Sequence, residues 1–111
     1  MKLKALSLLI AGLLFANHSM AGCAGKACSS VYIDRIFMQS NGGIFVGTNG
    51  DEELLNCTAV SKVYLTLDSN DRNASHLYSL LRSAQVSDTK VFVRIVENSK
   101  NCKIQHVISD R

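Results

Sequence analysis

The chain has 111 residues, of which 47% are hydrophobic and 19% are charged, and its formal net charge at pH 7 is +3. This length allows one small domain besides a short leader. The basic residues form no cluster that could follow a phosphate backbone, so nucleic acid is excluded as an expected partner.

Residues 1–21 have the pattern of a cleavable signal peptide. Lys2 and Lys4 precede an apolar run of eleven residues at 6–16, and the small-x-small sequence Ser19-Met20-Ala21 follows a short polar stretch. These are the three regions that direct export and cleavage. The apolar run is too short to anchor the chain stably in a membrane, because a spanning helix needs about 20 residues. We therefore expect residues 22–111 to form one nearly neutral domain in the periplasm or outside the cell.

A second interpretation of the leader is lipoprotein processing. Met20-Ala21-Gly22-Cys23 resembles a lipobox, with Met in place of the usual Leu. A lipid on Cys23 would leave three cysteines, one of them unpaired in an oxidising compartment, whereas four free cysteines make two bridges. The even number of cysteines therefore favours a product that begins at Gly22 and carries no lipid. Four cysteines allow three connectivities, and the spacing alone does not choose among them.

Three strand regions precede a helix. β-Branched and aromatic residues predict a strand at 30–38, and Asn41-Gly42-Gly43 is the turn signal of a hairpin with a second strand at 44–48. After a further turn signal, a third strand region runs from 54 to 68, with a break expected near 60–62. Its last part is a half-buried strand with Val63, Leu65 and Leu67 on one face.

One helix and two strands complete the chain. Leu77, Leu80, Leu81 and Ala84 recur at helical spacing and predict a helix at 74–85, with Asn73 or Ser75 as its N-cap. The alternation of residues 90–97 predicts a fourth strand. A turn then leads to a last strand at 102–109, for which we expect Ile104 and Ile108 on the core face.

The predicted fold class is mainly β with one helix, in the order β-β-β-α-β-β. This is the order of an OB-fold, a five-stranded barrel that binds oligonucleotides and oligosaccharides. In such a barrel the third and fifth strands run parallel side by side. Cys57 and Cys102 stand near the start of these two strands, so their pairing is geometrically natural and leaves Cys23 to pair with Cys28.

The size, the export signal and the order of elements, with the run Tyr78-Ser79-Leu80-Leu81-Arg82-Ser83-Ala84 before residues 91–95 and Cys102, resemble small exported OB-fold proteins of Gram-negative bacteria. More distantly, the chain resembles receptor-binding B subunits of AB5 toxins of the pertussis and subtilase-cytotoxin kind. The resemblance implies a binding or interaction module with a protein or glycan partner. Its alternative implication is a glycan-binding B subunit in a pentameric ring. It identifies no sugar-contacting residue in this chain.

Catalysis and metal binding are not expected. The domain has only two histidines, His76 at the start of the helix and His106 on the predicted Ile104 face, and neither has the partners of a catalytic base. Neither stands at ligand spacing from a cysteine pair, so no metal site is predicted. Asp51-Glu52-Glu53 lacks the spaced oxygen ligands of a calcium loop. We therefore predict a protein that is not an enzyme and needs no cofactor.

One possible ligand or interface face follows from the strand alternation. If Val91, Val93 and Ile95 face the core, Phe92 and Arg94 face outward, and in an OB barrel they lie beside the first strand with Tyr32 and Asp34. Aromatic rings with charged neighbours stack on sugars or anchor protein interfaces. The alternative is that these four residues form cross-strand pairs that only stabilise the sheet.

Overall fold

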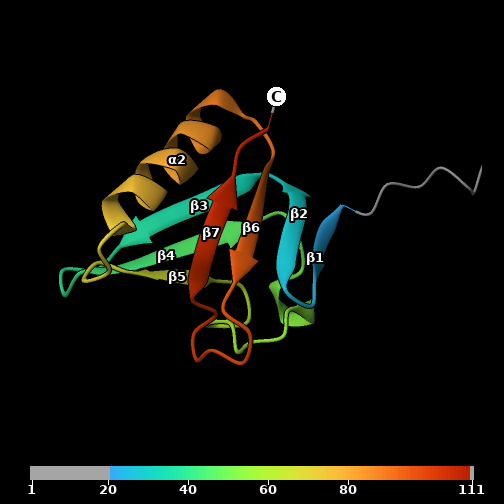
Figure 1. The fold of residues 1–111 in the computed structure, drawn as a ribbon, viewed down its shortest axis with the longest axis horizontal. Coiled ribbons are helices and arrows are strands. Elements are labelled where there is room, and N and C mark those ends of the chain that lie inside the picture. The colour runs from blue at the N-terminus through green and yellow to red at the C-terminus, as the bar shows by residue number, and fades with distance from the viewer. Residues whose placement is uncertain (1–20, 111) are drawn as a thin grey trace, which may run out of the picture.

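A computed structural model of the chain describes residues 21–110, so the predicted leader lies outside the described residues except for Ala21. One helix, α2 (Ala74–Ser87), packs against two antiparallel sheets, whose strands cross in the view of Figure 1. The first sheet has the order β1-β2-β6-β7, and the second has the order β3-β4-β5. The strands are β1 (Gly22–Ala24), β2 (Ala27–Val31), β3 (Ile33–Met38), β4 (Gly43–Thr48), β5 (Leu65–Asp68), β6 (Val91–Ile95) and β7 (Ile104–Ile108).

The prediction of a mainly β domain with one helix is confirmed, but the architecture differs from the expected five strands. Residues 21–110 form seven strands, and these two sheets are not closed into a barrel. One additional strand is β1, which forms a tight hairpin with β2 in which Cys23 faces Cys28. The other arises because the predicted first strand is divided at Tyr32.

Two bulges explain how the predicted first strand, now β2 and β3, pairs in both sheets. Between β2 and β6 the register shifts after Cys28, where Ser30 has a left-handed φ of 51°. Between β3 and β4 it shifts again, and Asp34 is the extra residue. Bulges bend a strand and increase its twist. The chain therefore leaves the first sheet at Val31 and enters the second at Ile33 without a loop.

The third strand region is shorter than expected. It begins with a 3-10 helix, η2 (Glu52–Leu54), and only its last part is the strand β5. Ser61 and Lys62 have φ values of 52° and 69°, which places a tight turn at the predicted break. Val63 belongs to this turn and is 46% exposed, so the prediction that it shares the buried face of Leu65 is wrong.

The helix lies where it was predicted and continues two residues further, to Ser87. Asn73 is its N-cap residue, although its side chain makes no capping hydrogen bond. Asp88 ends the helix in the left-handed conformation, and its N–H donates to the carbonyls of Ala84 and Gln85. Leu81 and Ala84 are buried on the face that contacts β3, β5 and β7.

A bulge also corrects the expected faces of the last strand. Ile95 pairs with Ile104, but the preceding residue of β6, Arg94, pairs with His106, so one residue of β7 is extra. A shift of one residue moves the following side chains to the opposite face of a sheet. Ile104 is buried as predicted, whereas Ile108 is 42% exposed and His106 is exposed instead of sharing the core face.

Both disulfides join elements near the core. Cys23 pairs with Cys28, Cys57 pairs with Cys102, and no cysteine is free. The second bridge lies where the two sheets meet, because the N–H of Thr66 on β5 donates to the Cys102 carbonyl at 3.0 Å. Thr66 also forms a parallel bridge with Lys103 immediately before β7. This junction is the link between β5 and the first sheet.

The two bridges should contribute unequally to stability. The Cys57–Cys102 bridge spans a sequence separation of 45 and the Cys23–Cys28 bridge one of 5. The chain-entropy model assigns about 4 kcal/mol to the first and about 2 kcal/mol to the second. A domain of this size has a total stability of only about 5 to 10 kcal/mol. We therefore expect the double variant Cys57→Ala, Cys102→Ala to melt far lower than Cys23→Ala, Cys28→Ala in thermal unfolding followed by circular dichroism. Equal losses would contradict this account.

Candidate functional site

Phe92 and Arg94, predicted as part of an outward face, lie together in a groove on the first sheet. They alternate on β6 with the buried residues Val91, Val93 and Ile95. Arg94 pairs with Ala27 on β2 and with His106 on β7, and the Phe92 ring stacks on the His106 ring with centroids 6.0 Å apart. The groove has a volume of about 660 Å³.

The other two predicted face residues lie elsewhere. Tyr32 stands between β2 and β3, and the Lys90 ammonium lies over its ring at 5.4 Å from the centroid. Asp34 is the exposed bulge residue of β3, which pairs with β4 in the second sheet. The structure therefore brings Phe92 and Arg94 together but assigns Asp34 to a strand that does not pair with β6.

A second surface, which the sequence reasoning missed, is an aromatic cluster on the outer face of the second sheet. Phe37 and Phe45 are directly opposite on β3 and β4, with stacked rings whose centroids are 4.8 Å apart. Tyr64 meets Phe37 edge-on at 5.1 Å and Phe45 at 6.4 Å. Such geometries stabilise aromatic pairs beyond the area that they bury. We call Phe37, Phe45 and Tyr64 the aromatic platform.

Two further residues hold Tyr64 on the sheet. Gly47 has no side chain, and a Cβ there would lie 3.4 Å from the Tyr64 ring, so the ring can rest on the strand. The Arg35 guanidinium donates a hydrogen bond of 3.1 Å to the Tyr64 hydroxyl. The platform therefore has one polar end at Arg35.

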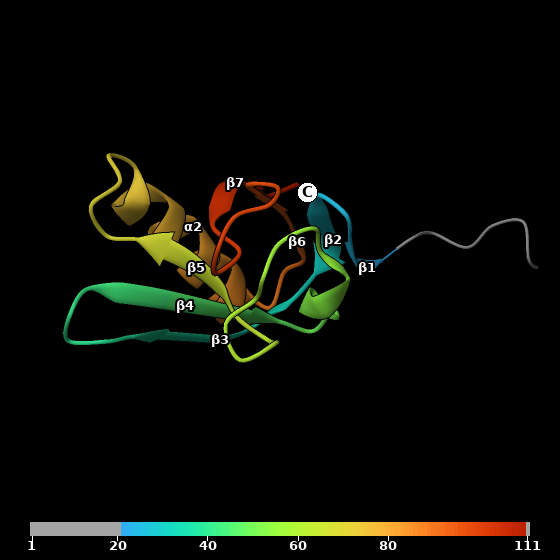
Figure 2. The ribbon, with the colours of Figure 1, turned by 90° about the horizontal axis from the view of Figure 1, so that it is seen from below.

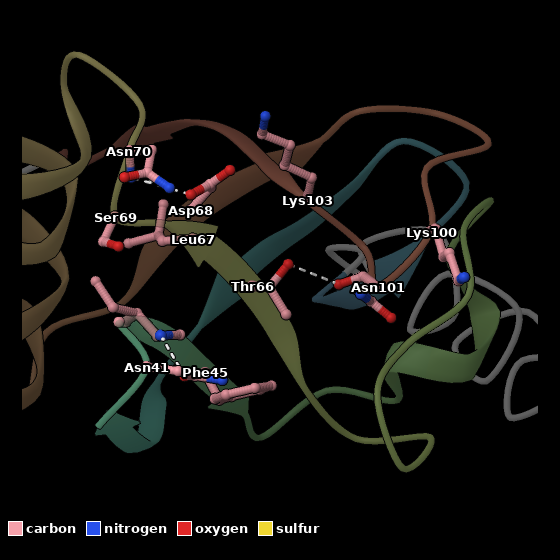
Figure 3. Close-up of a pocket in the computed structure, with 13 residues that line it drawn as sticks. Asn41, Phe45, Thr66, Leu67, Asp68, Ser69, Asn70, Lys100, Asn101 and Lys103 are labelled. Atoms are coloured by element: carbon pink, nitrogen blue, oxygen red, sulfur yellow. Dashed lines mark hydrogen bonds between the residues drawn. The ribbon is translucent and has the colours of Figure 1, made fainter. Parts of the chain in front are cut away.

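The other end of the platform opens into a cleft of about 360 Å³. The cleft lies on the outer surface of β4 and β5, between the β3–β4 turn and the loop that precedes β7 (Figure 3). Phe45 and Thr66 line its floor. Amide, hydroxyl, carboxylate and ammonium groups surround them, from Asn41, Asp68, Ser69, Asn70, Lys100, Asn101 and Lys103.

Hydrogen bonds fix several of these groups. The Thr66 hydroxyl donates to the Asn101 carbonyl at 2.9 Å, which joins the floor to the loop. Asp68 accepts from the Asn70 N–H at 2.9 Å at one end of the cleft (Figure 3). Lys103 pairs with Asp71 at 3.1 Å. Lys100, at the opposite end, has no ion-pair partner within residues 21–110, so its ammonium is available to a ligand.

His76 and His106 are both exposed, and His106 contacts Phe92, an apolar ring. Residues 21–110 include no cluster of three His, Cys, Asp or Glu residues that could hold a metal ion. In the same part of the chain, no helix has the length and hydropathy that crossing a bilayer requires.

Glu52 is a buried carboxyl, only 3% exposed, within the acidic run Asp51-Glu52-Glu53. It accepts hydrogen bonds from the Thr48 N–H at 3.1 Å and from the Thr48 hydroxyl at 3.2 Å. Burial raises the pKa of Glu52, and these hydrogen bonds oppose the rise only in part. Its partners belong to β4, so Glu52 ties η2 to the sheet.

Comparisons with known protein families, with curated proteins and with solved structures gave no match to this chain. The site must therefore be interpreted from its own geometry. One sequence signal could have indicated the platform, since Phe37 and Phe45 alternate with the inward-facing residues Ile36, Ile44 and Val46 on two strands of a predicted hairpin.

The raised pKa of Glu52 predicts a pH dependence of stability. Because the folded protein holds the proton more tightly than the unfolded chain, the contribution of Glu52 is fully present below its unfolded pKa. It is lost as the pH rises through the folded pKa. Glu52→Gln keeps an acceptor oxygen for Thr48 but cannot ionise. Its free energy of unfolding relative to the wild type should therefore increase from pH 4 to pH 7 in urea titrations.

The matched control is Glu53→Gln, because Glu53 is the exposed neighbour of Glu52 in the same 3-10 helix. The difference in free energy of unfolding between Glu53→Gln and the wild type should change little from pH 4 to pH 7. A Glu52→Gln variant that loses stability relative to the wild type as the pH rises would show that the charged form of Glu52 is the favoured one.

Proposed function

We propose that this protein is an exported binding module without enzymatic activity and that its ligand is a glycan held in the cleft beside the aromatic platform. The observation that carries the proposal is the continuity of two surfaces. Phe45 belongs both to the platform and to the floor of the cleft, so a stacking surface leads directly into a set of polar groups. Sugars offer both an apolar C–H face and hydroxyl groups, which match these two surfaces.

The order and pairing of the strands support the proposal, because they can be interpreted as those of an OB-like fold. If β2 and β3 count as one bent strand and the short hairpin strand β1 is set aside, five strands remain, with α2 between the third and the fourth. The parallel bridge between Thr66 and Lys103 then links the third strand to the fifth, as in a partly open OB barrel. Both the bend at Tyr32 and the short contact at Thr66 are compatible with such a barrel.

The position of the cleft also supports it. In OB-folds the face of the second and third strands, with the loops between strands one and two and between strands four and five, binds oligosaccharides or oligonucleotides. The corresponding elements here are β4, β5, the turn at residues 39–42 and the loop at residues 96–103. Residues of all four line the cleft. The aromatic and polar groups of the cleft point to a sugar whatever the strand order, so this agreement of position is a second argument.

The charges favour a glycan over a nucleic acid. The cleft contains Asp68, and one of its two lysines, Lys103, is paired with Asp71. A nucleic-acid site needs a continuous basic path along the backbone. Amide and hydroxyl groups such as those of Asn41, Ser69 and Asn101 exchange hydrogen bonds with sugar hydroxyls and need no opposite charge.

The proposal that the protein is exported rests on the sequence pattern of the leader and on the two disulfides. Disulfides persist in oxidising compartments such as the periplasm and the extracellular space. Two of them in a chain of this size suit an exported domain, and they agree with the pattern of residues 1–21. With Cys23 in a bridge, the protein has no free thiol at the position of the possible lipid anchor.

The test is binding to an array of bacterial and animal glycans, followed by calorimetry with the best-bound sugar. Phe45→Ala removes the ring that the platform shares with the cleft and should weaken binding by about fivefold, because an aromatic stack contributes about 1 kcal/mol. Asn41→Ala removes an amide of the cleft, which also accepts a hydrogen bond from the Gly43 N–H in the turn, and should weaken binding as well. The control is Phe92→Ala, which alters the groove on the other sheet and should leave the affinity unchanged.

Circular dichroism of Phe45→Ala distinguishes a lost site from a lost fold. Failure to bind any glycan at millimolar concentration would overturn the proposal. Binding that is lost in Phe92→Ala but kept in Phe45→Ala and Asn41→Ala would move the site to the groove.

A further inference from the structure

The groove on the first sheet is shaped by a change in side-chain size. Its floor on β1 and β2 consists of small residues, Ala24, Ala27 and Ser29 among them, whereas β6 contributes Phe92 and Arg94. Small residues beside large ones leave a hollow that no side chain of the described residues fills. The groove is therefore a mainly apolar recess with a guanidinium at its side.

The charges of the groove have a single sign. Its charged lining residues are Lys26 and Arg94. Lys26 is paired with Glu97 at 3.7 Å, but Arg94 has no ion pair within residues 21–110, and its Nε atom is buried without a hydrogen-bond partner. A partner of this groove should therefore present a carboxylate next to an apolar side chain.

The chain itself carries a carboxylate next to an apolar side chain at the rim of the groove. Leu54, the last residue of η2, lines the groove and is 61% exposed. The preceding residue, Glu53, is exposed and has no ion pair among the described residues. The 3-10 turn that presents them lies beside β1 in both ribbon views (Figures 1 and 2), and its contacts with β1 agree.

We propose that a second copy of this chain docks in the groove. Leu54 of each copy enters the apolar recess of the other, beside Phe92, and the Glu53 carboxylate of each copy pairs with Arg94 of the other. A surface that holds both the projecting group and its recess is self-complementary, which is the condition for a two-fold interface. A ring would need the projecting group and the recess on separate surfaces of the protomer.

The composition of the groove favours a protein occupant over a sugar. Alanine, cysteine, leucine and phenylalanine side chains offer few hydrogen-bonding groups for hydroxyls. Aromatic and arginine residues surrounded by apolar side chains are instead the usual centre of protein interfaces. Ten residues line the groove, fewer than the about 20 to 30 residues that each partner contributes to a standard interface, so a dimer that dissociates on dilution is expected.

Sedimentation velocity of the processed, oxidised protein from about 5 to about 500 µM tests the proposal, since small interfaces dissociate in this range. We expect a monomer–dimer equilibrium. Arg94→Glu and Glu53→Arg should each weaken dimerisation by at least about tenfold through like-charge contacts. The double variant with both changes restores opposite charges and should recover the wild-type dissociation constant within about threefold.

Two further variants separate this interface from folding and from the cleft. Leu54→Ser should abolish the dimer, whereas Val86→Ser, at an exposed position of α2, should not. Phe45→Ala should dimerise normally, because Phe45 lies on the other sheet. A monomer at the highest concentration, a pentameric mass, or a dimer indifferent to the charge changes would each overturn the proposal.

Discussion

The contact between β5 and the start of β7 is the constraint on which the rest of the molecule depends. At this point the Cys57–Cys102 disulfide, the bond from the Thr66 N–H to the Cys102 carbonyl and the bond from the Thr66 hydroxyl to the Asn101 carbonyl lie together. They join the two sheets and hold the loop before β7 against β5. The junction therefore both limits the motion of the sheets and forms one wall of the cleft.

The two surfaces of interest have different physical origins. The cleft is built by loops that this junction holds in place, and its floor is extended by rings that stack because Phe37 and Phe45 are opposite on neighbouring strands. The groove arises from side-chain size alone, since small residues on β1 and β2 lie beside Phe92 on β6. One surface belongs to each sheet. The proposed dimer and the proposed glycan would therefore occupy different surfaces.

Local patterns predicted the helix at 74–85, the hairpin around Asn41 and the alternation of Val91, Val93 and Ile95, because each depends on neighbouring residues only. The split of the first strand, the turn at Val63 and the exposed Ile108 were missed, since each follows from a bulge or turn that depends on tertiary pairing. The alternation of Phe92 and Arg94 with the buried residues of β6 also depends on neighbouring residues only, whereas the aromatic platform depends on the observed β3–β4 register and the position of Tyr64.

Amide hydrogen exchange at Thr66 tests the role of the junction most directly. Thr66 should be protected nearly as well as Val93, a core residue of β6, in the oxidised protein. In the Cys57→Ala, Cys102→Ala variant, under conditions where Val93 remains protected, Thr66 and the loop at residues 98–103 should exchange much faster. Unchanged protection of Thr66 relative to Val93 would contradict the account, because the disulfide would then not be what holds the two sheets and the cleft together.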